Sequence, residues 1–201
     1  MGILIALAVF FSAIIVHEFS HAFVASLRGD QTAARSGRLT LNPLAHIDPF
    51  GTLLLPVLLI LLNSPVLFGW AKPVPINFSG LRNPRRDMIW VGLAGPAANI
   101  ILAALATLLL KTGLKDIPGL SQVIGSVILF NVVLAVFNLV PIPPLDGSRI
   151  LMGLLPVPLA IRLASIERYG FIILFALIYL GFFNGIIWPV VAWVIYLLSL
   201  L

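Results

Sequence analysis

Long apolar runs are the feature of this sequence that most restricts its fold. The first begins near the N-terminus and continues to Leu27, and others cover residues 88–110 and 122–140. A transmembrane α-helix needs about 20 mainly apolar residues, and backbone within lipid must satisfy its own hydrogen bonds. With 61% hydrophobic residues, 9% charged residues and a mean hydropathy of +1.14, the chain is not expected to be soluble. We therefore predict an all-α polytopic membrane protein.

We expect one membrane-embedded domain over residues 1–201. The apolar runs predict about five to six transmembrane segments, counted by the length that a bilayer requires. A core at about residues 1–150 would be followed by C-terminal helices at about residues 169–201. No stretch between the runs is long enough for an accessory soluble domain. Such compactness favours a prokaryotic cell membrane.

The apolar run at residues 49–68 is interrupted by Pro56 and by the sequence Asn-Ser-Pro at residues 63–65. The loops on either side of this run, residues 28–48 and 69–87, are both basic. Basic loops favour the cytoplasmic side, so the segment between them should leave and return on one face. This pattern favours a re-entrant hairpin over a straight span.

The basic residues gather in loops rather than forming a polyanion-binding patch. The chain has 12 Lys and Arg against 7 Asp and Glu, a net charge of +5. Clustering in short loops is typical of the cytoplasmic side of a membrane protein. We therefore expect the N-terminus outside, the loop that begins at Arg28 in the cytoplasm, and no nucleic-acid partner.

The sequence HEFSH, from His17 to His21, lies in the last third of the first apolar run. Histidines four residues apart share one face of a helix, so both rings can reach one metal ion. Glu18 is rotated by about 100° from His17, close enough to act as a base on water without being a ligand. A carboxylate at the centre of a membrane helix costs about 2.5–3.5 kcal/mol on insertion scales and is usually functional. The spacing predicts two zinc ligands and a base.

A catalytic zinc site needs a third protein ligand and an open position. The chain has no cysteine, so this ligand must be a histidine or a carboxylate. Asp146 is the first choice because it follows a proline-broken segment at membrane depth, where irregular backbone must be buried in protein or line a wet cavity. The direction of the preceding span also brings Asp146 to the cytoplasmic side of the membrane, the same side as HEFSH. His46 and Asp48 compete for the role, and a simple turn role before Gly147 is the alternative for Asp146.

The remaining acidic residues are expected to be solvated or paired with nearby basic residues, as charges in loops usually are. They are Asp30, Asp87, Asp116 and Glu167.

Asn138 is an amide in an apolar run, eight residues before Asp146. One interpretation is an interhelical hydrogen bond. The other is catalytic, with the amide holding the peptide carbonyl or the oxyanion formed from it. The residues alone leave both open.

Three segments together resemble the site-2 protease family of intramembrane zinc metalloproteases. They are HEFSH in an early apolar run, GPAAN (residues 95–99) in a middle run, and NLVPIPPLDG (residues 138–147) in a later one. The resemblance extends from residue 17 to about residue 150. HExxH is moderately specific, and its combination with N-x-x-P-x-x-x-x-D-G is much more so. Without a PDZ or CBS module, the chain resembles a minimal form.

The resemblance implies one Zn²⁺ ion held by His17, His21 and Asp146, with Glu18 as the base and Asn138 at the substrate carbonyl. It implies that the substrates are transmembrane proteins cut within the lipid bilayer.

One further segment takes its interpretation from the same resemblance. KPVPIN, residues 72–77, would be an extended element near the substrate, although a proline-rich surface loop fits these residues equally well. The small residues around GPAAN predict close helix packing, with no chemical role for Asn99.

The predicted function is zinc-dependent intramembrane endopeptidase, hydrolysing peptide bonds in or near transmembrane segments. A membrane metal-ion transporter using the same His and Asp residues is the alternative. A transporter needs polar groups across the full membrane depth, whereas here they concentrate near one face. A pseudoprotease is disfavoured by the complete set of ligands and base. Serine and aspartyl intramembrane proteases fit poorly, because G-x-S-x-G and a second aspartate near Asp146 are missing.

Overall fold

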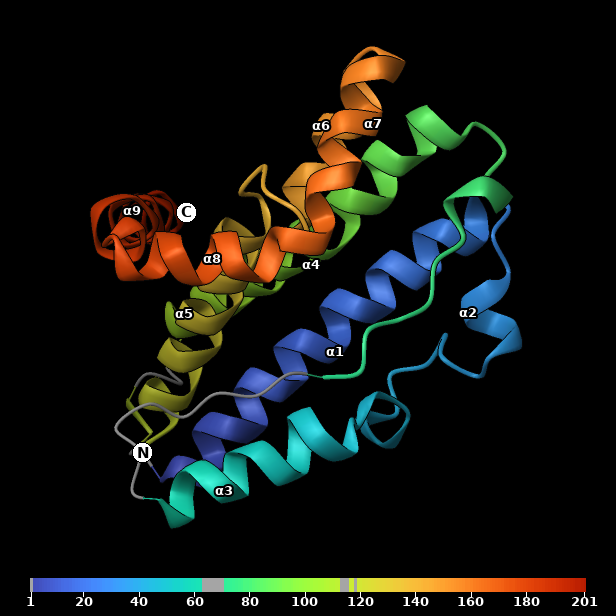
Figure 1. Ribbon diagram of the computed structural model, residues 1–201. Helices are drawn as coiled ribbons and strands as arrows, with labels where there is room; N and C mark the ends of the chain where they lie inside the picture. Colours follow the sequence, from blue (N-terminus) through green and yellow to red (C-terminus); the bar gives the residue numbers. More distant parts are fainter. Residues whose placement is uncertain (1, 63–70, 113–115, 118) are drawn as a thin grey trace.

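The computed structural model describes residues 2–62, 71–112, 116–117 and 119–201, and every regular element in these residues is helical, as predicted (Figure 1). The α-helices are α1 (Ile3–Leu27), α2 (Thr32–Arg35), α3 (Leu55–Leu61), α4 (Pro84–Leu110), α5 (Leu120–Asn138), α6 (Asp146–Leu154), α7 (Val157–Ile166), α8 (Gly170–Tyr179) and α9 (Trp188–Ser199). Short helical turns lie at Pro43–His46, Pro49–Leu54, Phe78–Gly80, Glu167–Tyr169 and Phe183–Ile187.

Three helices are long and apolar enough to cross a bilayer, and they are α1, α4 and α5. The segments Val157–Tyr179 and Phe183–Ser199 pass the same test only as a pair, with a bend of 73° between them. The described residues therefore hold three candidate spans, or four if the bent pair is one span. The prediction of an all-α chain with membrane-spanning helices is confirmed, and the count of five to six segments stays a prediction.

The run at residues 49–68 is helical as far as Leu61, first as a π-helical turn and then as α3. Asp48 begins this helix by accepting hydrogen bonds from the amides of Phe50 and Gly51. The interruption predicted at residues 63–65 lies outside the described residues, so the re-entrant hairpin stays a prediction.

Helix α4 is the centre of the bundle, because it packs against α1, α5 and α6. Buried alanines let the helices approach closely, and they include Ala22 on α1, Ala103 on α4 and Ala135 on α5. In lipid, where apolar burial alone does not drive helices together, such small residues allow extensive van der Waals contact. Gly92 and Gly95 are buried in α4 as predicted, while Ala97 of the same predicted patch is exposed.

The proline-rich segment breaks the helical path between α5 and α6, as predicted. Residues 139–145 are not helical, and α6 begins at Asp146. Prolines lack the N–H that a continuing helix needs. The turn is tight, because a Cβ on Gly147 would lie 2.2 Å from the carbonyl oxygen of Leu139. Glycine at this position therefore sets where α6, and Asp146 with it, begins.

Replacing Gly147 by alanine should destabilise the protein, because the added methyl group would meet backbone atoms that cannot move aside. We expect Gly147→Ala to lower the unfolding free energy by about 1–3 kcal/mol. The matched control is Gly125→Ala in α5, where a Cβ meets nothing within 4 Å. That change should stabilise the helix by about 0.5–1 kcal/mol. Thermal unfolding in detergent micelles measures both, and equal melting temperatures for the two variants would contradict the close approach.

Candidate metal centre and active site

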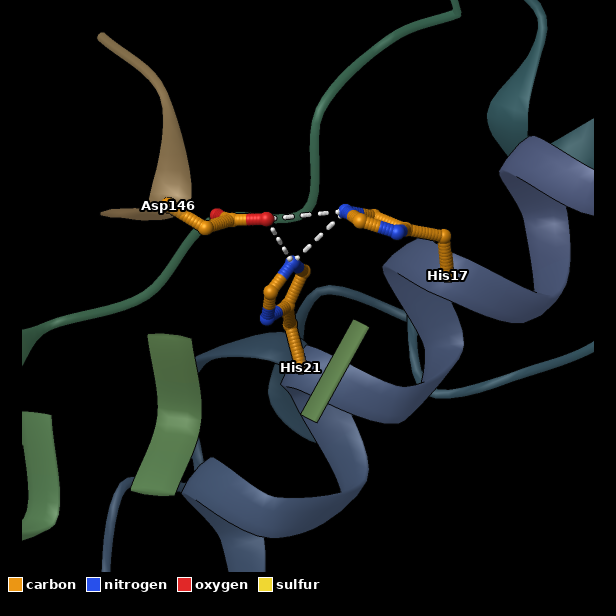
Figure 2. Close-up of side chains that lie close together, drawn as sticks. All are labelled: His17, His21 and Asp146. Carbon is orange, nitrogen blue, oxygen red and sulfur yellow. Dashed lines mark hydrogen bonds and ion pairs between the residues drawn. The ribbon is translucent and has the colours of Figure 1, made fainter. Parts of the chain in front are cut away.

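Three predicted side chains meet at one point, as Figure 2 shows. His17 and His21 come from α1, and Asp146 is the first residue of α6. The two Nε2 atoms lie 3.0 Å apart, and Oδ2 of Asp146 lies 3.0 Å from one and 3.1 Å from the other. Both histidines are buried. Helix periodicity brings the rings together, and the break before α6 brings the carboxylate.

The competing third ligands lie elsewhere. The Nε2 atom of His46 lies 2.8 Å from the carbonyl oxygen of Thr40, and the Asp48 carboxylate caps the helical turn that follows it. Among the described residues, the one cluster of His, Asp and Glu suited to a metal ion is His17, His21 and Asp146.

Two other acidic residues are ion-paired, as predicted. Asp87 pairs with Arg28 at 3.3 Å, and Glu167 pairs with Arg149. Asp116 is exposed. Asp87 and Glu167 therefore neutralise nearby arginines and take no part in the cluster of His17, His21 and Asp146.

Asp30 departs from the predicted solvated or ion-paired state, because it is buried and bound by amides and a hydroxyl. Its carboxylate accepts hydrogen bonds from Thr32 and from the backbone N–H of Asn77. Burial alone would raise the pKa of Asp30, but these bonds and nearby Arg35 lower it below its usual 3.8. The ionised Asp30 therefore stabilises the folded state at pH values above its usual pKa of 3.8. This stabilisation is lost as the pH falls through the lowered pKa of the folded protein.

The outer nitrogens of both histidine rings have fixed partners. Nδ1 of His21 lies 2.6 Å from the carbonyl oxygen of Val91, which can only accept, so this nitrogen carries the proton. Nδ1 of His17 lies 2.5 Å from Oδ1 of Asn99. Asn99 therefore does more than pack, and the sequence interpretation of this residue needs correction. Partners of this kind commonly orient metal-binding histidines.

The three inner atoms fit a zinc ion. With a proton on Nδ1, the Nε2 atom of a neutral imidazole offers a lone pair, so the cluster presents lone pairs and a carboxylate oxygen to one another. Such a group needs a positive charge among its atoms, which a bound metal ion or a proton shared with the carboxylate can supply. Bonds of 2.0–2.1 Å in a tetrahedron place ligand atoms about 3.3 Å apart, close to the distances between His17, His21 and Asp146.

Gly95 of α4 makes room for the rings. A Cβ at this position would lie 2.5 Å from Nε2 of His21 and 2.6 Å from Nε2 of His17. The glycine of GPAAN thus serves the metal cluster as well as helix packing.

A cavity of about 550 Å³ opens beside the cluster and is lined by both Glu18 and Asn138. The Glu18 carboxylate accepts a hydrogen bond of 2.8 Å from the backbone N–H of Val74. Asn138, the last residue of α5, donates from Nδ2 to the carbonyl of Leu134 in its own helix. Among the described residues, Asn138 forms no interhelical hydrogen bond, and it lines the cavity.

The KPVPIN segment, residues 72–77, is extended and runs beside α1 (Figure 1). Arg38 donates to the carbonyls of Lys72 and Pro73, and Val74 is buried. Pro73 and Val74 also line the cavity. Part of the segment thus forms a wall of the site, while Lys72, Pro73, Pro75 and Asn77 remain exposed, so the proline-rich surface loop considered as its alternative is not excluded.

Comparison with known proteins decides the family. The family model "Peptidase family M50" matches residues 114–181. A Bacillus subtilis protein named "Putative zinc metalloprotease YwhC" is 40% identical over 182 residues, covering 87% of this chain and 80% of the relative. The chain belongs to peptidase family M50, the site-2 protease family.

Two mycobacterial relatives agree with this assignment. Proteins named "Putative zinc metalloprotease Rip2" from Mycolicibacterium smegmatis and Mycobacterium tuberculosis strain H37Rv are 34% and 36% identical. They cover 94% and 89% of this chain, which spans 72% and 68% of their lengths. No solved structure matches the chain. The M50 chain is therefore a metalloprotease whose apolar helices suit an integral membrane protein, and its His-His-Asp cluster is the candidate zinc site.

Sequence reasoning missed the residues behind the cluster, namely Asn99, Asn131 and the Val91 carbonyl. One signal was available: Asn131 and Asn138 are seven residues apart in an apolar run, so they share a helix face. Nothing in the sequence pointed to the Val91 carbonyl, because every residue has a backbone carbonyl.

Gly95→Ala should disrupt the cluster, since the new methyl group would overlap both Nε2 atoms. We expect the purified variant to lose stoichiometric zinc while α4 still forms, because alanine is a better helix former than glycine. Metal analysis and circular dichroism measure these two outcomes. Gly125→Ala is the control for a helical glycine with open space around it. A Gly95→Ala protein with one zinc per chain would contradict the close approach.

Proposed function

We propose that this M50 protein is a zinc-dependent intramembrane endopeptidase that cuts peptide bonds in or near transmembrane segments of other membrane proteins. The ligands would be His17, His21 and Asp146, the base Glu18, and the carbonyl-binding amide Asn138. The observation that carries the proposal is the mutual approach of the three ligand atoms to 3.0–3.1 Å, with Glu18 in the same cavity.

When bound, zinc supplies a Lewis acid that polarises the scissile carbonyl and lowers the pKa of water. Glu18, one residue after the first ligand, takes the proton from the attacking water and delivers it to the leaving amine. The Val74 N–H holds one carboxylate oxygen of Glu18 and leaves the other for this transfer. The Asn138 amide has a second N–H beyond the one on Leu134, and this N–H can bind the developing oxyanion.

The surroundings of the site suit a transmembrane substrate. Apolar side chains such as Phe10, Ile14 and Phe137 line the cavity together with the polar groups. A substrate helix must unwind before its carbonyls can be attacked, because they are bonded within the helix. The extended residues 72–77 stand beside Glu18, where an unwound stretch would enter.

The orientation of the protein follows from its charges. HEFSH lies in the second half of α1, towards the basic loop that begins at Arg28. We infer a prokaryotic cell membrane with this end in the cytoplasm, from which water reaches the site. The same rule supports a re-entrant segment at residues 49–68. The lengths of the apolar runs support five to six membrane segments in one peptidase domain, with a core at about 1–150 and C-terminal helices at about 169–201.

The roles of base and ligands can be separated by metal analysis. Glu18→Gln should abolish cleavage of a membrane substrate and keep stoichiometric zinc, because the amide cannot accept the proton. His21→Ala and Asp146→Ala should lose zinc, each by removing one ligand. Asp116→Asn, which changes an exposed carboxylate away from the cluster, is the control. Stoichiometric zinc in Asp146→Ala would remove Asp146 from the site.

Asn138 should act on the transition state rather than on the metal. Replacing an oxyanion donor typically costs 10²–10³ in kcat. We expect Asn138→Leu to lower kcat by about this factor, with little change in KM or in bound zinc. Steady-state cleavage of a transmembrane peptide in micelles measures both constants. A normal kcat would show that the amide only caps α5.

Zinc flux tests the transporter alternative, since a buried His-His-Asp cluster could also hold a passing ion. Reconstituted liposomes should show no zinc uptake with wild-type protein or with Glu18→Gln. Uptake that persists in Glu18→Gln, together with no cleavage by the wild type, would favour transport over proteolysis.

A further inference from the structure

We propose that Asn131 and Asn99 form a two-amide relay that sets the orientation and the protonated nitrogen of His17. The inference rests on the proposed role of His17 as a zinc ligand. It concerns residues from two other helices, α5 and α4, that touch neither substrate nor metal. Both amides are fully enclosed, with exposed fractions of 2% for Asn131 and 0% for Asn99. They are positioning residues, and each amide donates a hydrogen bond to a backbone carbonyl, Asn131 to that of Val127 and Asn99 to that of Ala13.

The relay begins at a carbonyl that can only accept. Nδ2 of Asn131 donates to the carbonyl of Val127, one turn earlier in α5, at 2.8 Å. The nitrogen side of the Asn131 amide is therefore directed along its own helix. Its oxygen side is left to face α4, where Oδ1 lies 2.7 Å from Nδ2 of Asn99.

Asn99 has its orientation fixed by two acceptors. Its Nδ2 donates to Oδ1 of Asn131 and, at 3.2 Å, to the carbonyl of Ala13 in α1. Both hydrogens of this amide are thus used, and its oxygen must face the other way. That oxygen lies 2.5 Å from Nδ1 of His17, so this ring nitrogen carries a proton. The Nε2 lone pair of His17 is consequently left for the metal.

The two histidines differ in what holds them. Nδ1 of His21 is bonded to the backbone carbonyl of Val91, which no substitution at that position removes. His17 depends on the Asn99 side chain, and the amide of Asn99 is held by Asn131 at 2.7 Å and more loosely by the Ala13 carbonyl at 3.2 Å. Outer partners of metal-binding histidines typically contribute 10–100-fold to metal affinity. Asn131 should therefore influence zinc binding although it does not touch His17, because Asn99 connects the two side chains.

Removing Asn131 Oδ1 leaves a buried N–H of Asn99 without its partner, which is costly in a dry interior. If the Asn99 amide turns over, its nitrogen faces His17 Nδ1 and displaces the proton to Nε2, where it blocks the metal. Asn131→Leu has this effect with little change in size. Asn131→Asp, neutral when buried, keeps one donor for Val127 and one acceptor for Asn99.

The experiment measures zinc Kd by chelator competition on the full chain in detergent micelles. We expect Kd to rise about 10-fold in Asn131→Leu and about 10–100-fold in Asn99→Leu, with Asn131→Asp near wild type. If Asn131→Leu does not fold, Asn131→Ser replaces it, because the serine hydroxyl reaches the Val127 carbonyl but not Asn99. Thr107→Val is the matched control, a buried α4 side chain that bonds only the Ala103 carbonyl among its described contacts.

A spectroscopic readout separates orientation from general loss of stability. The chain has 3 histidines, so ¹⁵N-histidine labelling reports on few rings. In zinc-loaded wild type we expect a slowly exchanging Nδ1–H on His17, assigned by comparison with His17→Ala. This signal should be lost or exchange rapidly in Asn131→Leu and be restored in Asn131→Asp. Thr107→Val should keep both the signal and the wild-type Kd, whatever its melting temperature.

Two results would overturn the relay alone. One is a wild-type Kd in both Asn131→Leu and Asn131→Ser, and the other is an equal rise of Kd in Thr107→Val. In either case His17→Ala would still lose zinc, and the proposed function would stand. Stoichiometric zinc in His17→Ala would overturn both, because the relay would then end at a residue that binds no metal.

Discussion

The approach of two imidazole nitrogens and one carboxylate oxygen to within about 3 Å is the constraint on which this structure depends. In an apolar bundle, groups that all offer lone pairs repel one another unless a positive charge, either a metal ion or a proton, stands between them. The rings cannot relax by turning, because their outer nitrogens are held by Val91 and Asn99. The bundle is therefore built around a charge, which accounts for polar side chains in helices that otherwise suit lipid.

Close backbone approach makes this arrangement possible. Gly95 lies against the imidazole rings, and Gly147 lies against the backbone of Leu139 and Val140 at the start of the proline-rich segment, each where a Cβ would overlap neighbouring atoms. Small residues between membrane helices are usually explained by packing alone. Here the same residues let α4 press on the histidines of α1 and let α6 begin beside them. Both helix packing and the geometry of the site therefore require a residue without a Cβ at these two positions.

Much of the site was predictable because it depends on local periodicity. Histidines four apart share a helix face in any α-helix, so His17, Glu18 and His21 could be assigned from spacing. Asp146 was predictable for a different reason, since prolines at membrane depth require a protected, wet surrounding. The roles of Asn99 and Asn131 were not, because an amide in an apolar helix serves packing as readily as catalysis. The burial of Asp30 was also missed, since its partners at Thr32 and Asn77 meet only after the chain folds back along α1.

By itself the sequence determined the all-α character of the chain, its helices long and apolar enough to span a membrane, the shared helix face of the histidine pair, and the resemblance to site-2 proteases. These properties follow from composition, from the 3.6-residue repeat and from short motifs, which need no knowledge of distant contacts. Only the tertiary structure decided that Asp146 rather than His46 or Asp48 joins the histidines. It also decided that residues 72–77 bind Glu18 and that three helices share one amide network. Those outcomes depend on which segments lie side by side, and helix packing sets that in three dimensions.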